Sequence, residues 1–309
     1  MIRNKLIVIT GPTATGKTEL ATDLAIEIDG EIISADSRQI YRNMNIGTGK
    51  DISEYQKNGK SIPYHLIDII NPGEKYSVYQ FQKDFISTYQ NICDRGKQPI
   101  LCGGTGLYIE SIIKGYKLPD VPENPKLRKS LKTKSLEELT AILASLKTLH
   151  NKTDVDTCNR AIRAIEIALF EKEHPTSRNP IPPMETIVLG IWFKRDILRK
   201  RITERLVSRI NQGMIEEGKK LLDSGVDPEV LISYGLEYKF ITWYLQGKIS
   251  YEDFFSKLNT SIHQFAKRQV TWFRRMERQG IKIHWIDGNL PSNEKLRTAM
   301  DILTSKGFI

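Results

Sequence analysis

Cysteine is scarce in this chain of 309 residues, and the three that occur, Cys93, Cys102 and Cys158, form no CxxC pair. Domains built on disulfides need paired cysteines, and structural zinc sites need closely spaced ligands. The sequence therefore argues against both kinds of scaffold and favours a reducing compartment.

Long apolar runs are missing as well. No stretch approaches the roughly 20 apolar residues that a membrane-spanning helix needs. The N-terminal MIRNKLIVIT holds too short an apolar stretch for a secretory signal and runs directly into a glycine-rich loop. We therefore expect a cytoplasmic protein that binds no membrane. Nothing in the sequence indicates an obligate subunit interface, so we expect a monomer.

The composition is ordinary for a packed globular protein, with 39% hydrophobic and 27% charged residues. The formal net charge of +9 is more informative. A positive excess suits an acidic partner such as nucleic acid, although solubility alone explains it as well. Charge by itself leaves the partner open.

Short β-branched runs alternate with amphipathic segments over the first part of the chain. The patterns predict helices at 17–28 and 78–94 and strands at 5–10, 31–35, 65–70, 99–102 and 186–192. Strands that alternate with helices indicate an α/β fold with a parallel sheet.

Proline-rich stretches interrupt this pattern twice. Pro119, Pro122 and Pro125 form the first, and the segment 174–183 with its four prolines forms the second. Because the strand pattern returns at 186, we predict an inserted subdomain at 118–183 within a core made of 1–117 and 184–309. The C-terminal part of that core, 196–278, is predicted to be mainly helical and is very basic.

The inserted stretch carries helical patterns only. Ser135 and Glu138 form a capping box that opens a helix running to Leu149. Residues 159–170 are amphipathic, with apolar residues at helical spacing. The insertion is therefore predicted to be all-helical.

A phosphate-binding loop follows the first predicted strand and precedes the first predicted helix. Its residues, in order, match GxxxxGK[ST] throughout: Gly11, Pro12, Thr13, Ala14, Thr15, Gly16, Lys17 and Thr18. Backbone N–H groups and the helix N-terminus attract phosphate oxygens, Lys17 neutralises their charge, and the Thr18 hydroxyl binds Mg²⁺. The loop predicts a polyphosphate ligand, which this motif leaves open among ATP, GTP and a prenyl diphosphate.

Asp36 ends the second predicted strand. In open α/β sheets the ligand binds beyond the carboxyl ends of the strands, so Asp36 is directed at the crevice. The alternative is an Asp that forms a turn or caps a helix before Ser37.

Two basic helices follow in the C-terminal part. Arg201, Arg205 and Arg209 share one helical face, which is either a solvated surface or a source of one arginine for the diphosphate. The segment 263–278 places cations beside aromatic residues, an arrangement that suits phosphate contact and base stacking. Packing of its aromatic residues in the core is the alternative, but that leaves the surplus cations unexplained.

Taken together, these segments resemble the tRNA dimethylallyltransferase family, also called tRNA isopentenyltransferases. The P-loop is shared by many families, whereas the other motifs are highly specific as a set. The matching segments follow the order of the family over nearly the whole chain: GPTATGKT at 11–18, ISADSRQIYRNMNIGTGK at 33–50, GGTGLY at 103–108, NRAIRAIE at 159–166, RITER at 201–205 and KRQVTWFR at 267–274.

The resemblance implies a core like that of P-loop nucleoside-triphosphate hydrolases and a defined reaction. A dimethylallyl group passes from dimethylallyl diphosphate to N6 of adenine 37, in tRNAs that read codons beginning with U. Asp36 would accept the N6 proton as general base. The phosphate loop with Lys17, Mg²⁺ at Thr18 and Arg205 would stabilise the departing diphosphate, and Thr13 lies in the loop that contacts the donor.

The resemblance also implies contacts with the anticodon stem-loop, over which the inserted helices would close. The target base must leave its stack to reach the crevice. Arg128, Arg160 and Arg163 are expected to bind RNA phosphates. The full implied set is Asp36, Ser37, Arg38, Gln39, Thr105, Arg128, Asn159, Arg160, Ala161, Ile162, Arg163, Tyr234, Gly235, Leu236, Glu237, Tyr238, Lys239, Lys267, Arg268, Gln269, Val270, Thr271, Trp272, Phe273 and Arg274.

The chain departs from the family pattern at two positions. Asp51 stands where proline usually follows the GTxK segment, and Glu237 stands where glycine is expected in the segment near 235. The chain has no C-terminal zinc finger of the kind that eukaryotic relatives carry, so it matches the short bacterial form.

Three rival functions use the same loop. A P-loop kinase of a small molecule or nucleotide leaves the basic helix at 263–278 without a role. An adenylate isopentenyltransferase, which acts on free nucleotide, needs neither that helix nor the insertion. An RNA-binding switch driven by nucleotide hydrolysis predicts RNA affinity that depends on ATP or GTP.

Overall fold

The computed structural model describes residues 4–57, 59–148, 153–174 and 181–309. The chain divides into two compact units. The first consists of residues 1–114 and 182–309, and the second of residues 115–181. The sequence boundaries of the insertion, 118 and 183, lie close to these.

A six-stranded parallel sheet forms the centre of the first unit, in the order β5-β2-β6-β1-β7-β8. Apart from Lys5, every residue of β1, β2 and β6 is buried, which explains their nearly continuous apolar sequences. The strands are β1 Lys5–Thr10, β2 Gly30–Ser34, β5 Tyr64–His65, β6 Gln98–Gly103, β7 Glu185–Trp192 and β8 Ile283–Asp287.

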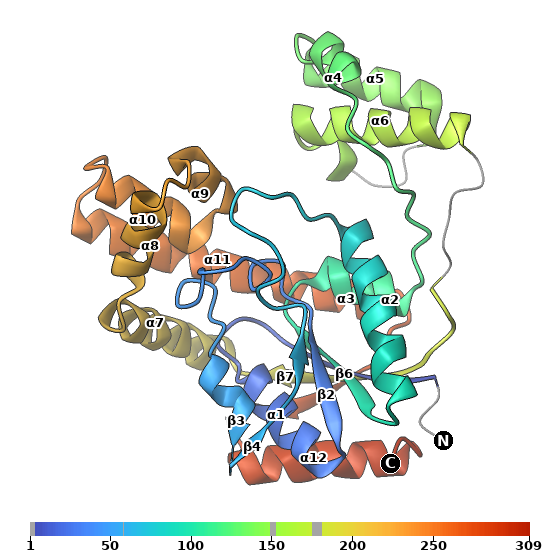
Figure 1. Cartoon of the computed structure of the whole chain (residues 1–309), viewed down its shortest axis with the longest axis vertical. Coiled ribbons are helices and arrows are strands. Elements are labelled where there is room, and N and C mark those ends of the chain that lie inside the picture. The colour runs from blue at the N-terminus through green and yellow to red at the C-terminus, as the bar shows by residue number, and fades with distance from the viewer. Residues whose placement is uncertain (1–3, 58, 149–152, 175–180) are drawn as a thin grey trace. The chain divides into compact units, whose positions relative to one another are not determined.

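Helices cover both faces of the sheet (Figure 1). On one face, α1 (Lys17–Glu27) and α12 (Ser292–Ser305) pack together, and Leu24 and Leu303 share a core with Ile9 of β1. On the other face, α2 (Val78–Asp94) packs against β2, β6 and the short α3 (Gly106–Ile113). The predicted α/β class with a parallel sheet is confirmed.

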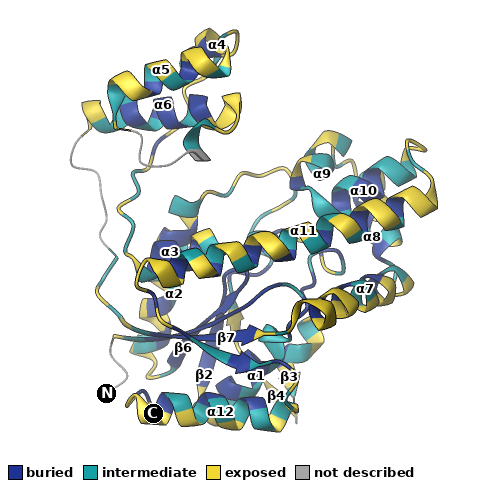
Figure 2. Cartoon of the chain, turned by 180° about the vertical axis from the view of Figure 1, so that it is seen from behind, coloured by how far each residue is buried: buried dark blue, intermediate teal, exposed yellow. Residues whose placement is uncertain are grey.

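The C-terminal helices of this unit form a second hydrophobic core. Phe254, Leu258 and Ile241 lie in it together with Leu206 and Met214, all buried. Figure 2 shows the alternation of buried and exposed residues along α11. The helices are α7 Arg195–Asn211, α8 Met214–Asp223, α9 Pro228–Tyr234, α10 Leu236–Leu245 and α11 Tyr251–Arg278.

The regular elements of the second unit are all helices among its described residues. Ser135 and Glu138 form the predicted capping box at the start of α5, and Leu139 and Leu143 of α5 pack against Ile165 of α6. Helix α5 ends at Leu146, short of the predicted end at Leu149, and residue 149 itself lies outside the described residues. The same holds for 175–180 of the predicted linker. The helices are α4 Pro125–Leu131, α5 Leu136–Leu146 and α6 Cys158–Glu173, with a short 3-10 turn, η2, at Thr153–Val155.

The predicted strand at 65–70 is wrong over most of its length. Only Tyr64 and His65 form β5, because Leu66 and Asp68 adopt positive φ angles of 60° and 55° and turn the chain away from the sheet. A short 3-10 turn, η1 (Ile52–Tyr55), and a hairpin of β3 (Gln56–Lys57) and β4 (Lys60–Ser61) precede this segment and were not predicted.

No helix within the described ranges is both long and apolar enough to cross a membrane.

Candidate active site

A cavity of about 1020 Å³ lies at the carboxyl ends of β1, β2 and β6. Because these three parallel strands are neighbours in the sheet, the loops that follow them meet at one edge. The phosphate loop, the segment from Asp36 to Gln39 and the Gly104–Thr105 turn line the cavity, together with side chains from α7, α10 and α11. All of these elements belong to the first unit.

The phosphate loop is held by its own side chains. The Thr15 hydroxyl donates to the Pro12 carbonyl at 2.9 Å, and Lys17 Nζ donates to the same carbonyl at 2.7 Å. Gly16 precedes α1 with a φ of 80°, a conformation that glycine adopts without strain. Burial lowers the pKa of Lys17 from 10.5 to about 8, and the neighbouring Arg205 acts in the same direction.

Gln269 of α11 ties the phosphate loop to the turn after β6. Its side-chain oxygen accepts the Thr13 N–H at 2.9 Å, and its side-chain nitrogen donates to the Gly104 carbonyl at 2.9 Å. Gln269 is buried. Sequence reasoning missed this role, although a polar residue within the apolar stripe that contains Ala266 and Phe273 was the available signal.

Asp36 lines the cavity two residues after the end of β2, at the crevice where it was expected. One of its carboxylate oxygens accepts the Arg38 N–H at 2.8 Å, so Asp36 also forms the turn that was the alternative interpretation. The Ser37 N–H donates to Thr105 Oγ1 at 3.0 Å. The segment carrying Asp36 is therefore bound to the turn after β6.

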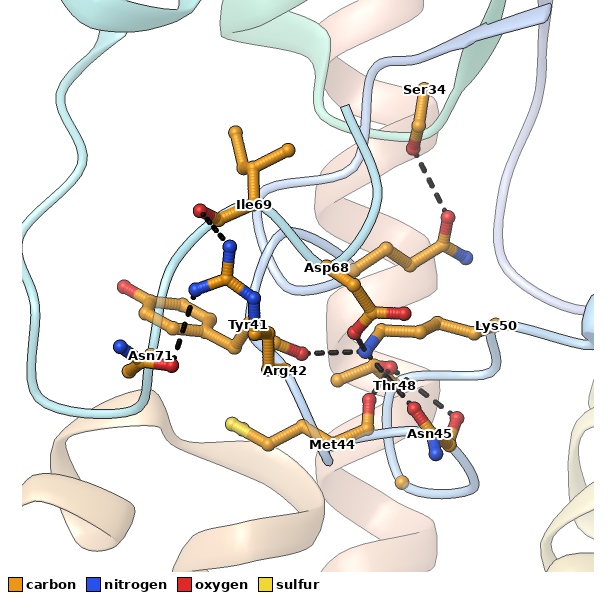
Figure 3. A network of polar contacts seen from close by, with 12 residues as sticks. Ser34, Tyr41, Arg42, Met44, Asn45, Thr48, Lys50, Asp68, Ile69 and Asn71 are labelled. Carbon is orange, nitrogen blue, oxygen red and sulfur yellow. Dashed lines mark hydrogen bonds and ion pairs between the residues drawn. The ribbon is translucent and has the colours of Figure 1, made fainter. Parts of the chain in front are cut away.

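A buried polar network fixes the loop that follows (Figure 3). The Lys50 ammonium is buried, donates to the Tyr41 carbonyl and Asn45 Oδ1, and forms an ion pair with Asp68. Gln39 accepts from Ser34 Oγ at 3.0 Å and donates to the Gly49 carbonyl at 2.9 Å. Lys50, in the GTGK segment, therefore stabilises the loop through buried hydrogen bonds and an ion pair.

Glu217 of α8 binds the same loop from the other side. Its carboxylate accepts the N–H groups of Asn45, Ile46 and Gly47 at 2.7, 2.8 and 3.0 Å. It also accepts the Tyr238 hydroxyl at 2.7 Å. Three successive backbone donors are thus satisfied by one side chain.

Three arginines of α7, Arg201, Arg205 and Arg209, line the cavity, and of these Arg201 is also exposed to solvent. Arg201 Nε donates to the Ala14 carbonyl at 3.0 Å. Arg205 lies 3.5 Å from Thr13 Oγ1 and donates to Asp51 Oδ2 at 2.9 Å. Two of the arginines that were predicted to share one helical face, Arg201 and Arg205, therefore contact the phosphate loop.

Carboxyl groups face these cations. Burial, reinforced by the Asp51 carboxylate, raises the pKa of Glu54 to about 7, and Glu54 Oε2 is buried without a hydrogen bond to any described residue. Burial also raises the pKa of Glu237, against the effect of Arg209. The site thus holds carboxyl groups that are protonated more readily than usual.

Two family models match the sequence. The model described as IPP transferase matches residues 39–276, and the model described as isopentenyl transferase matches residues 4–62. A curated protein of Parabacteroides distasonis, tRNA dimethylallyltransferase 1, is 57% identical over 302 residues, which are 98% of each chain. The chain belongs to the tRNA dimethylallyltransferase family.

Further relatives support the same family assignment. The tRNA dimethylallyltransferase 2 of Phocaeicola vulgatus is 53% identical, over 99% of this chain and 100% of that one. The crystal structure of the tRNA isopentenylpyrophosphate transferase of Bacillus halodurans shares 31% identity, with a TM-score of 0.72 over 98% of this chain and 97% of that one. A eukaryotic dimethylallyltransferase acting on tRNA, at 23% identity and a TM-score of 0.78, shares the fold. The predicted P-loop-like core and the predicted prenyltransferase class are confirmed.

In this family member, α11 divides the residues that the resemblance assigned to tRNA. Lys267, Arg268, Thr271 and Arg274 are exposed, whereas Gln269 and Phe273 are buried and Val270 is half-buried. Trp272 packs so closely on Gly106 that a Cβ there would lie 2.3 Å from the indole. Arg275 stacks on the indole at 4.1 Å. Only part of the predicted segment therefore presents side chains to a ligand.

The assigned positions at 234–239 lie at the junction of α9 and α10. Tyr234 and Tyr238 are buried, and the Tyr234 hydroxyl accepts the Gly73 N–H at 2.6 Å. Lys239 lies over the Trp243 ring at 4.4 Å. Gly235, Leu236 and Glu237 are half-buried, and the whole segment lines the cavity.

In the helical unit, Glu166 binds two of the three assigned arginines, and Arg160 pairs with Asp156 instead. Arg128 donates to the Glu166 carboxylate at 2.8 and 3.1 Å, and Arg163 forms a second ion pair with it. Burial alone would raise the pKa of Glu166, but these hydrogen bonds and the Asn124 N–H lower it to about 2. Asn159 and Arg160 are exposed, and the side chains of Ala161 and Ile162 are buried in the core of the unit.

Proposed function

We propose that this chain transfers a dimethylallyl group from dimethylallyl diphosphate to N6 of adenine 37, in tRNAs that read codons beginning with U. One observation carries the proposal. A phosphate loop and a carboxylate, Asp36, line the same cavity in a member of the tRNA dimethylallyltransferase family.

The phosphate loop and Arg205 would bind the donor through its diphosphate. As the allylic C–O bond breaks, negative charge grows on the departing diphosphate. Preformed donors placed where charge develops stabilise the transition state more than the ground state. Lys17 at the head of α1 and Arg205 beside Thr13 supply two cations for this purpose.

Asp36 would accept the proton of the acceptor amine. A neutral exocyclic amine is a weak nucleophile, and it must lose a proton as its nitrogen forms the new bond to the allylic carbon. The carboxylate of Asp36 lines the cavity and has its position fixed by the Arg38 N–H. Diphosphate leaves with the electron pair of the broken bond, and Asp36 carries the proton away.

The residues present fit a Mg²⁺ ion on the diphosphate. Mg²⁺ keeps several waters and uses one or two protein oxygens together with substrate phosphates, so it needs no dedicated carboxylate cage. Thr18 lines the cavity at the start of α1, and Glu54 contributes a buried oxygen without a hydrogen bond to the described residues. When bound, the ion neutralises part of the charge of the leaving group.

The acceptor tRNA would be held by exposed cations and by the cavity wall. A flipped base costs about a few kcal/mol, which contacts with the surrounding backbone offset. The exposed residues of α11, Lys267, Arg268, Thr271 and Arg274, are suited to RNA phosphates. Asp36–Gln39, Thr105 and 234–239 line the cavity that would receive the base. In the helical unit, the resemblance assigns Arg128, Asn159, Arg160 and Arg163 to further contacts, and the three arginines would have to bind RNA while paired with Glu166 or Asp156.

A direct assay tests this function. The protein is incubated with unmodified tRNA, Mg²⁺ and radiolabelled dimethylallyl diphosphate, and the tRNA is digested to nucleosides. We expect label in N6-(dimethylallyl)adenosine alone, and none when guanosine replaces adenine 37. Label in free AMP instead of tRNA would support an adenylate isopentenyltransferase, and phosphoryl transfer from ATP would support a kinase.

A further inference from the structure

Two residues that depart from the family pattern meet the same side chain. Asp51 stands in place of a proline and Glu237 in place of a glycine. Arg209 of α7 lies between them, with its Nη2 3.7 Å from Asp51 Oδ2 and its charge in electrostatic contact with Glu237. The three residues line the cavity beside Arg205.

Arg209 is buried but incompletely bonded. Only 9% of its surface is exposed, and its Nη2 makes no hydrogen bond to any residue in the described part of the chain. A guanidinium carries five N–H donors in a planar fork, and a buried donor without an acceptor is unfavourable. The guanidinium therefore has hydrogen-bonding capacity that the protein leaves unused.

The loop that carries Gly49 makes room for this guanidinium. A Cβ at Gly49 would lie 1.8 Å from Arg209 Nη2, and Gly49 has a φ of +68°. The positive φ favours glycine here, and any side chain at this position would displace the Arg209 guanidinium. Gln39 and Glu217 fix the loop that carries Gly49. Because Gly49 lies against the Arg209 guanidinium, this loop also limits where the guanidinium can lie.

The Asp51 carboxylate is shared by two arginines. Its Oδ2 faces Arg205 at 2.9 Å and Arg209 at 3.7 Å, so one carboxylate oxygen serves two guanidiniums. Arg205 also contacts Thr13 of the phosphate loop. A ligand with several anionic oxygens at this loop would offer both guanidiniums the acceptors that Asp51 supplies only in part.

We propose that Arg209 is a second guanidinium ligand for the diphosphate of the donor, and that Asp51 is the counter-ion from which the diphosphate takes over Arg205 and Arg209. The inference rests on the proposed function in one respect, namely that a diphosphate binds at Gly11–Thr18. Asp51 then lowers the affinity for diphosphate, whereas Arg209 raises it.

Calorimetric titration of inorganic diphosphate with Mg²⁺ into the full chain tests this without any transfer reaction. We expect Arg209→Gln to raise the dissociation constant by about tenfold or more, which corresponds to about 1.4 kcal/mol. Asp51→Asn is expected to lower it severalfold. Arg199→Gln, an exposed position on the same helix, removes the same charge and is expected to change it less than twofold.

The opposite signs keep the inference falsifiable. Unchanged diphosphate affinity in a folded Arg209→Gln protein would overturn the role of Arg209. If that variant does not fold, Asp51→Asn decides, because weaker binding in it would show that Asp51 only positions Arg205. Loss of tRNA affinity with normal diphosphate affinity would make Arg209 an RNA contact and overturn the inference.

Two further experiments identify which diphosphate-containing ligand binds and test this inference separately from the proposed function. Titrations with dimethylallyl diphosphate and with ATP show which ligand responds to Arg209→Gln, and we expect the prenyl donor to respond. A wild-type protein whose diphosphate affinity depends on Arg209, but which transfers nothing to tRNA, would refute the proposed function and leave this inference standing. A wild-type protein that binds no diphosphate would overturn the inference, while the transfer assay judges the function separately.

Discussion

The side-chain oxygen of Gln269 accepts the backbone N–H of Thr13 at 2.9 Å, which joins the long helix α11 to the phosphate loop. The same side chain donates to Gly104. A residue within the segment assigned to tRNA therefore contacts the donor loop instead.

Replacing Gln269 with Leu should impair donor binding more than tRNA binding. The substitution leaves the Thr13 N–H and the Gly104 carbonyl without their partner, at a cost of about 1–3 kcal/mol. We expect the KM for dimethylallyl diphosphate to rise about tenfold, with tRNA affinity in filter binding within twofold of wild type. Thr260→Val, at an exposed position of α11 outside the segment assigned to tRNA, is the control. Weakened tRNA binding with a normal KM for the donor would contradict this interpretation.

Asp36→Asn should abolish transfer while leaving tRNA affinity largely intact. The amide keeps the shape and the hydrogen bond to the Arg38 N–H but cannot take up the N6 proton. Loss of a general base costs roughly 10²–10⁴-fold in rate, which single-turnover measurements resolve. A wild-type single-turnover rate would remove Asp36 from the role of base.

Arg205→Ala should reduce turnover more than tRNA affinity, because its guanidinium contacts Thr13 of the donor loop. Loss of one donor to a developing anion typically costs about 10²–10³-fold in kcat. Rapid-quench kinetics and filter binding on the same preparation separate the two effects. The reverse pattern, intact chemistry and weak tRNA binding, would make Arg205 an RNA contact.

Charge removal at Lys267 should weaken tRNA binding and flatten its dependence on salt. A phosphate contact releases counterions, so its loss reduces the slope of log K against log salt by about 0.7–0.9. Lys257→Gln lies on the same helix, where Lys257 pairs with Asp253, and serves as the control. Equal slopes for Lys267→Gln and wild type would place Lys267 outside the RNA interface.

Diphosphate affinity should fall as the pH rises through the pKa of Lys17. Burial lowers that pKa to about 8, so an increase in pH through this value removes a positive charge from the loop. Lys17→Arg keeps its charge throughout, since an arginine pKa lies above about 12, and should flatten the profile. Calorimetry on both proteins gives the comparison, and parallel profiles would show that another group titrates.

The sequence was sufficient to predict the parts of the fold that depend on local pattern. The phosphate loop between β1 and α1, the helix Val78–Asp94 and the capping box at Ser135 all follow from spacing and chemistry within a few residues. Asp36 was predicted to face the crevice because it ends a parallel strand, and it lines the cavity.

What sequence reasoning missed depends on contacts between distant segments. The strand predicted at 65–70 is interrupted where Asp68 turns to pair with Lys50. The edge strand β8 was not predicted, because no strand pattern was recognised in its sequence. It pairs with β7, which is far away in the sequence. Gln269 and Phe273 were assigned to RNA by their motif, but burial against the phosphate loop and the core decides where their side chains lie.

Glu217 gives the loop at Asn45–Gly47 an anion from within the protein, bound by consecutive amides much as a phosphate loop binds its ligand. The loop's curvature is thereby linked to a side chain on α8, more than 160 positions later in the chain. In evolutionary terms the two sites are not independent, because a neutral residue at 217 would leave amide donors unsatisfied that only a reshaped loop accommodates. Substitutions at these two places are therefore expected to occur together among relatives.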